Sequence, residues 1–201
     1  MQLPESERLA RLRLARSLNV GPRTYAYLLR RFGNAERALE AMPSMAAAGG
    51  KRDYVPCPMS DAETEVAAGQ NCGATMVLLG EPEYPALLVA IDHPPPVLWV
   101  MGLVEVFRHP AIAIVGARNA SALGLRTARN LVRGLGEAGQ VVVSGLARGI
   151  DAAAHGAAIE TGTIAVMAGG IDRIYPPEHD QLAARIAEAG ALISECPMGM
   201  E

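Results

Sequence analysis

The feature that most constrains the fold of this chain is an alternation of four short apolar runs with longer segments of helical composition. The runs are AIAIVG at 111–116, VVVSG at 141–145, TIAVMAGG at 163–170 and ALISE at 191–195, and the helical segments are 122–138, 151–161 and 178–189. Strands that are apolar along their whole length and separated by helices are typical of a parallel sheet with helices on both faces. We therefore expect a Rossmann-like α/β fold in which these four strands are adjacent. Two further runs, 75–79 and 97–100, are candidate strands.

The N-terminal part follows a different pattern, with apolar residues recurring at spacings of three and four, the period of a helix. This spacing predicts two helices interrupted at Asn19–Pro22 and a third helix at 35–42, followed by an irregular connection over 44–60. The arrangement resembles a helix-hairpin-helix, although Asn19 stands where the first hairpin glycine is usual. A DNA contact and a purely packing or protein-contact role both remain open for it. We expect two domains, a helical domain with its linker over 1–60 and a Rossmann-like domain over 61–201.

Charge and cysteine content narrow the class of protein. Residues 1–60 hold ten Lys/Arg against five Asp/Glu, whereas residues 61–201 hold eight against sixteen. The three cysteines are far apart and lack C-x-x-C spacing, so we expect neither a disulfide framework nor a metal site. The charged opening MQLPESERLARLR and the absence of a long apolar run favour a cytoplasmic protein.

The loops that follow the first two parallel strands combine glycine with arginine. Ligands of such sheets bind at the carboxyl ends of the strands, and backbone amides, helix N-termini and guanidinium groups together suit a phosphate. The sequence therefore predicts an anion site at these two strand ends. Its candidate residues are Gly116, Arg118, Ser121, Ser144, Gly145, Arg148 and Gly149.

Enzyme functions fit the same residues less well. The loop after the first strand is not G-x-G-x-x-G, which argues against a dinucleotide-dependent dehydrogenase. Ser144, Asp151 and His155 lie close in sequence, but Ser144 is not in a G-x-S-x-G elbow. We interpret Asp151 as an acid at a helix start and His155 as a buried hydrogen-bonding residue. A third reading, an interaction module, would leave Arg118 and Arg148 as ordinary surface residues.

From Tyr84 to Glu195 the sequence resembles the DNA-processing protein A (DprA/Smf) family. The resemblance rests on YPALL, DHPPPVLWVMG, AIVGARNASALG, VVSGLARGIDAAAH, TIAVMAGGIDRIYP and ALISECPMG. It implies a homodimer that binds incoming single-stranded DNA and loads the recombinase RecA during natural transformation, with no cofactor. It also implies that the N-terminal helices form a sterile-alpha-motif-like domain.

Carried over by position, the resemblance places Gly116 and Arg118 in a phosphate-binding turn and assigns DNA contact to the second strand end, from Ser144 to Gly149. The runner-up is a nucleotide-phosphate-hydrolysing Rossmann-like enzyme of the LOG type, whose PGG-x-GT-x-x-E stretch we do not find. The family's FP-x-RNR-type stretch is also missing, so we expect an incomplete sheet, with dimer and RecA-contact residues beyond Glu201.

Overall fold

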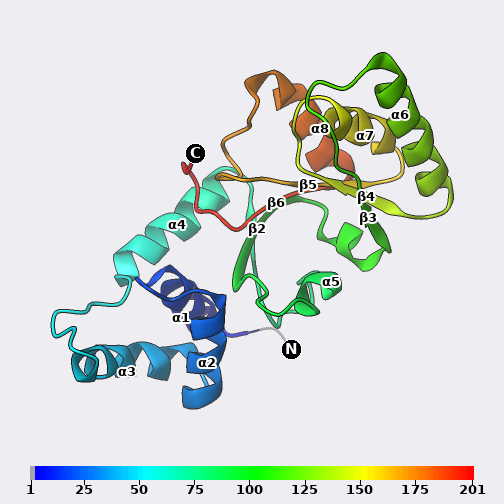
Figure 1. Ribbon diagram of the computed structural model, residues 1–201. Coiled ribbons are helices and arrows are strands. Elements are labelled where there is room, and N and C mark those ends of the chain that lie inside the picture. Colours follow the sequence, from blue (N-terminus) through cyan, green and yellow to red (C-terminus); the bar gives the residue numbers. More distant parts are fainter. Residues whose placement is uncertain (1–2) are drawn as a thin grey trace. The chain divides into compact units, whose positions relative to one another are not determined.

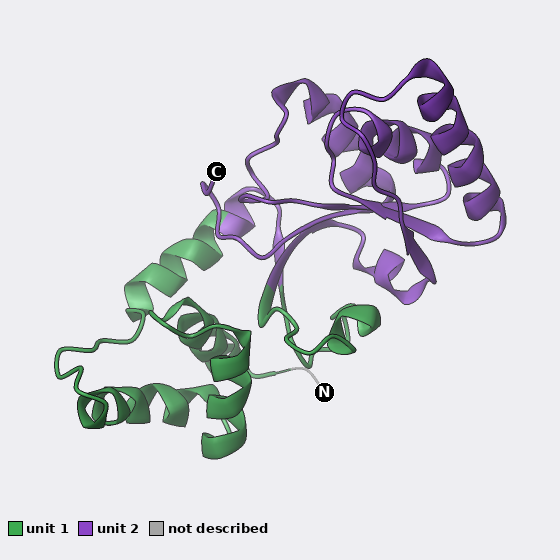
Figure 2. Cartoon of the chain, in the orientation of Figure 1, with its two compact units in different colours: residues 1–68, 77–97 green, residues 69–76, 98–201 purple. Residues whose placement is uncertain are grey.

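The computed structural model describes residues 3–201, which fold into two compact units (Figures 1 and 2). Unit 1 comprises residues 1–68 and 77–97, and unit 2 comprises residues 69–76 and 98–201. Within the described residues, no helix combines the length and the apolar character needed to cross a bilayer.

Unit 1 is built around three packed helices, α1 (Glu5–Arg16), α2 (Pro22–Phe32) and α3 (Ala35–Ala48). The apolar residues that recur at spacings of three and four lie on one side of each helix, and these sides pack together in one core. Asn19, between α1 and α2, has a φ of 65°, a left-handed conformation that asparagine tolerates better than most residues, so it replaces the expected hairpin glycine. The core residues are Ala10, Leu14, Tyr25, Leu28, Ala35, Ala38, Leu39 and Met42.

The predicted connection over 44–60 is wrong in extent, because helices enter it from both sides. Helix α3 continues through Pro43 to Ala48, since Met45 still packs on the core and alanine favours helix. Helix α4 then begins at Met59 and ends at Asn71. The Arg16 guanidinium of α1 makes a bidentate contact with Glu65 of α4, at 2.8 to 3.1 Å. The short helix α5 (Ala86–Val89) also belongs to unit 1.

A six-stranded sheet has the order β1-β2-β6-β5-β4-β3. The four strands expected to be adjacent are so, and they pair in parallel. β2 joins them antiparallel to β6, with Trp99 opposite Ser194, so the sheet is mixed rather than parallel throughout. The strands are β1 (Thr75–Leu78), β2 (Val97–Gly102), β3 (Ala111–Ala113), β4 (Val141–Ser144), β5 (Thr163–Val166) and β6 (Ala191–Ser194).

Three helices connect the parallel strands: α6 (Ala122–Glu137), α7 (Ile150–Ala158) and α8 (Asp180–Ala189). Each connection moves to the next strand in the same direction, and right-handed crossovers of this kind put their helices on the same side. Figure 1 shows α6, α7 and α8 together on one side of the sheet, so these helices cover one face rather than both. Their core includes Val132 of α6, Val142 of β4 and Ala154 of α7. Two short 3-10 helices, η1 (Val104–Arg108) and η2 (Pro177–His179), complete unit 2.

Candidate nucleic-acid interface

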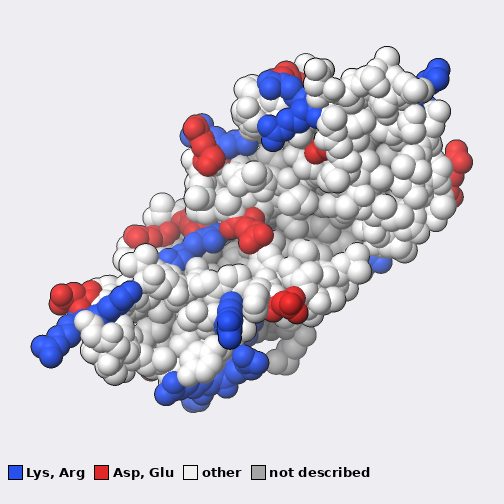
Figure 3. Space-filling view, viewed as in Figure 1, with Lys and Arg blue, Asp and Glu red and all other residues white. Residues whose placement is uncertain are grey.

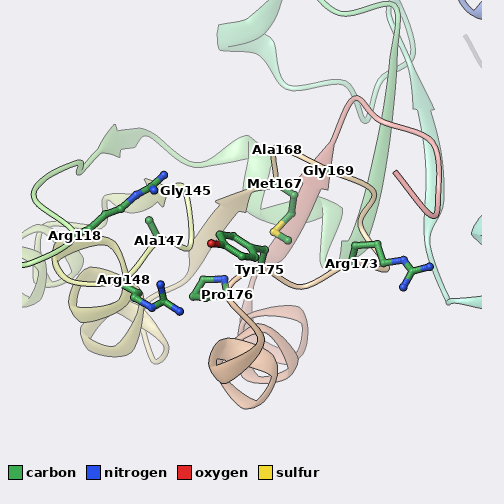
Figure 4. A pocket seen from close by; sticks show the side chains of 10 residues that line it. All are labelled: Arg118, Gly145, Ala147, Arg148, Met167, Ala168, Gly169, Arg173, Tyr175 and Pro176. Carbon is green, nitrogen blue, oxygen red and sulfur yellow. The ribbon is translucent and has the colours of Figure 1, made fainter. Parts of the chain in front are cut away.

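A pocket of about 120 Å³ opens at the carboxyl ends of β4 and β5, and we call it the strand-end pocket (Figure 4). In Figure 4, Arg118 and Arg148 flank the Tyr175 ring on one side, and Arg173 lies on the other side with its guanidinium pointing away from the ring. The pocket thus combines cationic groups with an aromatic face. Its lining residues are Arg118, Gly145, Ala147, Arg148, Met167, Ala168, Gly169, Arg173, Tyr175 and Pro176.

The β4–α7 loop is held in shape by the buried carboxylate of Asp151. Its Oδ2 atom accepts hydrogen bonds from the amides of Gly145 at 3.1 Å and Ala147 at 3.4 Å. The Ile150 amide donates to the carbonyl of Ala117 at 3.2 Å. Asp151 therefore lies in the first turn of α7, as predicted, but its task is to fix the loop. Because three loop amides already have acceptors, a phosphate here would depend on guanidinium groups more than on the amide cradle that the sequence predicts.

The two arginines of the predicted site have different surroundings. Arg118 is exposed on the β3–α6 loop, and no hydrogen bond or ion pair joins its side chain to another residue within 3–201. The Arg148 Nε donates to Oε1 of Glu178 at 2.5 Å, and both side chains are about half exposed. This contact raises the pKa of Arg148 and lowers the pKa of Glu178. The Arg118 guanidinium can therefore bind an anion directly, whereas the Arg148 guanidinium must either keep its contact with Glu178 while it binds the anion or break that contact.

Three other predicted site residues have roles in packing or in backbone hydrogen bonds. A Cβ at Gly116 would lie 2.6 Å from the Ile150 side chain, so only glycine fits there. Ser121 is the N-cap of α6 and accepts from the Gly124 amide at 3.2 Å. Ser144 is buried, and its hydroxyl donates to the Ile114 carbonyl at 2.6 Å. The structure thus brings Arg118, Gly145 and Arg148 together in the pocket, and Gly116, Ser121 and Ser144 do not line it. DNA contact stays a prediction for all six.

Gly149 has a backbone role at the edge of this site. Its φ of 79° is left-handed, and a Cβ there would lie 2.2 Å from the Ala117 carbonyl oxygen. It does not line the strand-end pocket but lines a groove between α6 and α7. Its DNA contact is likewise a prediction.

Sequence reasoning missed the contribution of the loop after β5. Met167, Arg173 and Tyr175 all line the pocket from this loop, and the Tyr175 side chain is 68% exposed. The available signal was the Gly169-Gly170 turn that follows the strand, with an arginine and a tyrosine within the next five residues. A large exposed aromatic residue beside arginines is typical of single-strand-binding surfaces.

The residues of the imagined Ser/His/Asp cluster do not form a triad. The Ser144 hydroxyl and the Asp151 carboxylate are engaged with backbone groups, as described above. The Nδ1 of His155 lies 2.8 Å from the Thr163 hydroxyl, which donates its own proton to the Val142 carbonyl at 2.8 Å. Nδ1 therefore carries the imidazole proton, and burial lowers the pKa of His155 to about 4. His155 is the buried hydrogen-bonding residue that the sequence predicts. No group of three or more His, Cys, Asp or Glu side chains within residues 3–201 is placed to hold a metal ion.

Unit 1 carries its own basic surface. Figure 3 shows basic side chains gathered over α2, which contributes Arg23, Arg30 and Arg31. The Arg31 guanidinium lies 5.9 Å from the ring centre of Tyr27 and 5.3 Å from that of Phe32. These contacts stabilise the local arrangement of α2, and the question of DNA contact by the hairpin stays open.

Comparisons with known proteins agree with this arrangement. Residues 75–201 match the family described as DNA recombination-mediator protein A. Residues 5–68 match the DprA-like N-terminal HHH domain. Together the two matches account for most of both units.

Two curated relatives match 59% and 66% of this chain. Protein Smf from Synechocystis sp. is 42% identical over 125 residues, which are 59% of this chain and 31% of the relative. The DNA processing protein DprA of Bacillus subtilis is 38% identical over 135 residues, or 66% of this chain and 46% of the relative. The matched part thus spans less than half the length of these curated relatives.

Two solved structures share the architecture. DNA processing protein A from Streptococcus pneumoniae covers the whole chain with a TM-score of 0.70 and 24% identity, and 70% of that chain is matched. At this identity the likeness concerns the fold. DNA processing protein A from Helicobacter pylori, reported for its single-stranded DNA binding mode, matches 63% of this chain and 58% of its own, with a TM-score of 0.57 and 27% identity.

Proposed function

The chain belongs to the DNA recombination-mediator protein A family, and from this membership we propose that it binds single-stranded DNA in the strand-end pocket. The observation that carries the proposal is the convergence of an unpaired Arg118, a paired Arg148 and the exposed ring of Tyr175 on one pocket. A relative from Helicobacter pylori is described as a single-stranded-DNA-binding protein, which supports the same ligand class here.

The pocket offers one group suited to a DNA phosphate and another suited to a DNA base. The planar guanidinium of Arg118 suits two phosphate oxygens, and α7 directs the positive end of its dipole toward the same loop. The Tyr175 ring offers a face on which a base can stack without regard to sequence. Single-stranded DNA presents both groups at short spacing, whereas a free phosphate would leave the ring unused.

We extend the proposal to the cellular role that the family membership suggests. In it, the DNA-bound protein loads RecA during natural transformation, acts as a homodimer and works in the cytoplasm as a binding protein without a cofactor. The names of the relatives, which are DNA processing proteins, support this role. The alternative is hydrolysis of nucleotide phosphates by a LOG-type enzyme. It is less favoured because residues 1–201 contain no PGG-x-GT-x-x-E stretch. The candidate catalytic residues Ser144, Asp151 and His155 are engaged in structural hydrogen bonds.

One paired assay separates binding from catalysis. Fluorescence anisotropy with a labelled oligo(dT) measures binding, and phosphate or base release from nucleoside monophosphates measures hydrolysis. We expect saturable binding that weakens as salt rises, and no hydrolysis. Hydrolysis that is lost in Arg118→Ala, without oligonucleotide binding by the parent protein, would show the pocket to be an active site instead.

A further inference from the structure

Helix α6 carries three exposed arginines on one flank. Arg126, Arg129 and Arg133 follow each other at spacings of three and four, which places them on the same side of the helix. Ala128 and Val132, which face the core, are buried. Within residues 3–201 no hydrogen bond or ion pair joins these three arginines to an acidic residue. This flank of α6 therefore presents positive charge without a partner.

Two of these arginines line a groove between α6 and α7, the α6–α7 groove, which has a volume of about 410 Å³. None of the described residues lining it is acidic. The α7 side is made of glycine and alanine, and a Cβ placed on Gly156 would meet nothing within 4 Å. An extended chain can therefore approach the α7 backbone closely while Arg129 and Arg133 reach it from α6. The lining residues are Leu125, Arg129, Arg133, Gly149, Ala152, Ala153, Gly156 and Ala157.

The groove begins beside the strand-end pocket. Gly149 lines its near end and directly follows Arg148, which lines the pocket. A Cβ on Gly149 would lie 2.5 Å from the Arg118 carbonyl oxygen, so both pocket arginines are adjacent to the groove entrance. From Gly149 to Ala157 the groove follows α7 for about 12 Å at 1.5 Å per residue. That length corresponds to about three or four nucleotides at the stacked rise of about 3.4 Å.

We propose that the α6–α7 groove is a second segment of the DNA site, in which Arg129 and Arg133 hold the phosphodiester backbone of a single strand that has left the strand-end pocket. The inference rests on the proposed function and extends it to residues that neither the motifs nor the pocket include. Phosphates fit better than an acidic protein segment, because the groove offers cations and a small-residue floor but few large apolar side chains for a protein partner to bury.

The test compares two oligo(dT) lengths, roughly 5 and roughly 20 nucleotides, by fluorescence anisotropy. We expect the double variant Arg129→Ala/Arg133→Ala to weaken binding of the long oligonucleotide by about ten- to a hundredfold and to leave the short one unchanged. The slope of log K against log salt for the long oligonucleotide should fall by about 1.4, which corresponds to two lost phosphate contacts on a single strand. Arg118→Ala should weaken both lengths.

Two further variants keep the test independent of folding and of bulk charge. Arg126→Ala removes the same charge from the same helix at a position that does not line the groove, and we expect little effect. Gly156→Leu fills the floor without removing a charge, and it should weaken only the long oligonucleotide while the far-ultraviolet circular dichroism stays unchanged.

The outcomes separate this inference from the proposed function. If the parent protein binds both lengths and the double variant binds them equally well, the groove is a solvated surface and only this inference fails. If the double variant weakens both lengths alike, its arginines act on the pocket and the second segment does not exist. If poly-glutamate displaces the long oligonucleotide as effectively as unlabelled DNA does, the groove is a docking surface for acidic proteins. A parent protein that binds neither length overturns both proposals.

Discussion

At the residue scale, the contribution of an arginine to DNA affinity depends on which groups already contact its guanidinium. Arg118 enters binding with an exposed and unpaired guanidinium. The Nε of Arg148 is already bonded to Glu178 before DNA binds. Binding of a phosphate to Arg148 therefore contributes only the difference in free energy between the contact with the phosphate and the contact with Glu178. Exposed ion pairs of this kind contribute little to stability, so the pair can open without a large cost to the fold. The two arginines should therefore not contribute equally to affinity.

This difference leads to a prediction for three substitutions. Arg118→Ala should weaken binding of single-stranded DNA by about ten- to over a hundredfold, the effect of losing one charged hydrogen-bonded contact of roughly 1.5 to 3 kcal/mol. Arg148→Ala should weaken it less. Glu178→Gln should strengthen binding, because it releases Arg148 and removes a negative charge from the pocket rim. Anisotropy titrations at one fixed salt concentration measure all three.

The matched control for this series is Arg185→Ala, which removes an exposed arginine of α8 that does not line the pocket. Its affinity should equal that of the parent protein. Weaker binding by Glu178→Gln would contradict the interpretation of Glu178 as a competitor and would instead make it a residue that positions Arg148.

Tyr175 allows a prediction about bases rather than phosphates. Tyr175→Ala should cost about 1 to 3 kcal/mol of binding, because a stacked base loses its platform. Tyr175→Phe should retain most of the affinity, since the ring is what stacks. The readout is affinity for oligo(dT) compared with an abasic oligonucleotide of the same length. An equal loss for both ligands would show that the ring positions the loop instead of stacking on a base.

At the element scale, helices and strands with a regular hydrophobic pattern were predictable from the sequence. Features that depend on tertiary contacts were not. The four parallel strands follow from apolar runs whose composition suits a buried sheet, and their order follows from the handedness of the crossovers. The end of α3 did not follow, because the helix continues past residue 42 to Ala48, where Met45 still packs on the core. The antiparallel addition of β2 depends on long-range pairing that no local pattern encodes.

The site shows the same limit. Arginine and glycine after the first two strands pointed to one end of the sheet, and Arg118, Gly145 and Arg148 share a pocket there. The acceptor role of Asp151 and the engagement of Arg148 with Glu178 join residues whose side-chain directions only the folded backbone sets. The loop after β5 was left out because Arg173 and Tyr175 lie farther along the chain from their strand end than Arg118 and Arg148 do from theirs.

Asp151 therefore carries the prediction at this scale. Asp151→Ala removes the charged acceptor of the Gly145 and Ala147 amides, and hydrogen bonds to a charged group contribute about 1.5 to 3 kcal/mol. Stability should fall by that amount, and DNA affinity should fall with it, because the loop that carries Arg148 loses its anchor. Asp151→Asn, which retains an acceptor oxygen, should lie between the alanine variant and the parent protein. Urea denaturation and anisotropy give the two values, and unchanged stability in the alanine variant would refute the anchoring role.

At the scale of the whole molecule, the net charge of residues 61–201 is negative, but the described side chains that line the strand-end pocket and the α6–α7 groove include several arginines and no acidic residue. Residues 61–201 hold sixteen Asp/Glu and eight Lys/Arg, yet five of those eight arginines line the strand-end pocket or the α6–α7 groove. Two acidic residues outside the lining of either cavity, Glu178 and Asp172, pair with two of the pocket arginines. A surface of this kind attracts an anionic chain over a short range only, since charges farther away than about 10 Å are screened at moderate salt. The five arginines are Arg118, Arg129, Arg133, Arg148 and Arg173.

The stability of the whole α/β sheet should depend on pH through His155. Burial lowers its pKa to about 4, whereas an unfolded histidine has a pKa of 6.5, so between these values the unfolded chain binds more protons than the folded one. Stability should therefore be highest above pH 6.5 and fall as the pH drops toward 4, by up to about 3 kcal/mol at about 1.4 kcal/mol per pKa unit.

Fluorescence of the single tryptophan, Trp99, reports this loss, because the residue is buried in β2 and is 1% exposed. Urea denaturation followed at pH 7.5, 6, 5 and 4.5, values chosen at order of magnitude to cross the window, should show a falling midpoint in the parent protein. His155→Gln removes the titrating ring, so its midpoint should be lower at pH 7.5 but should change less with pH. His93→Gln alters an exposed histidine and should keep the parent's profile. A His155→Gln profile as steep as that of the parent would assign the acid sensitivity to the carboxylates and leave His155 with a packing role alone.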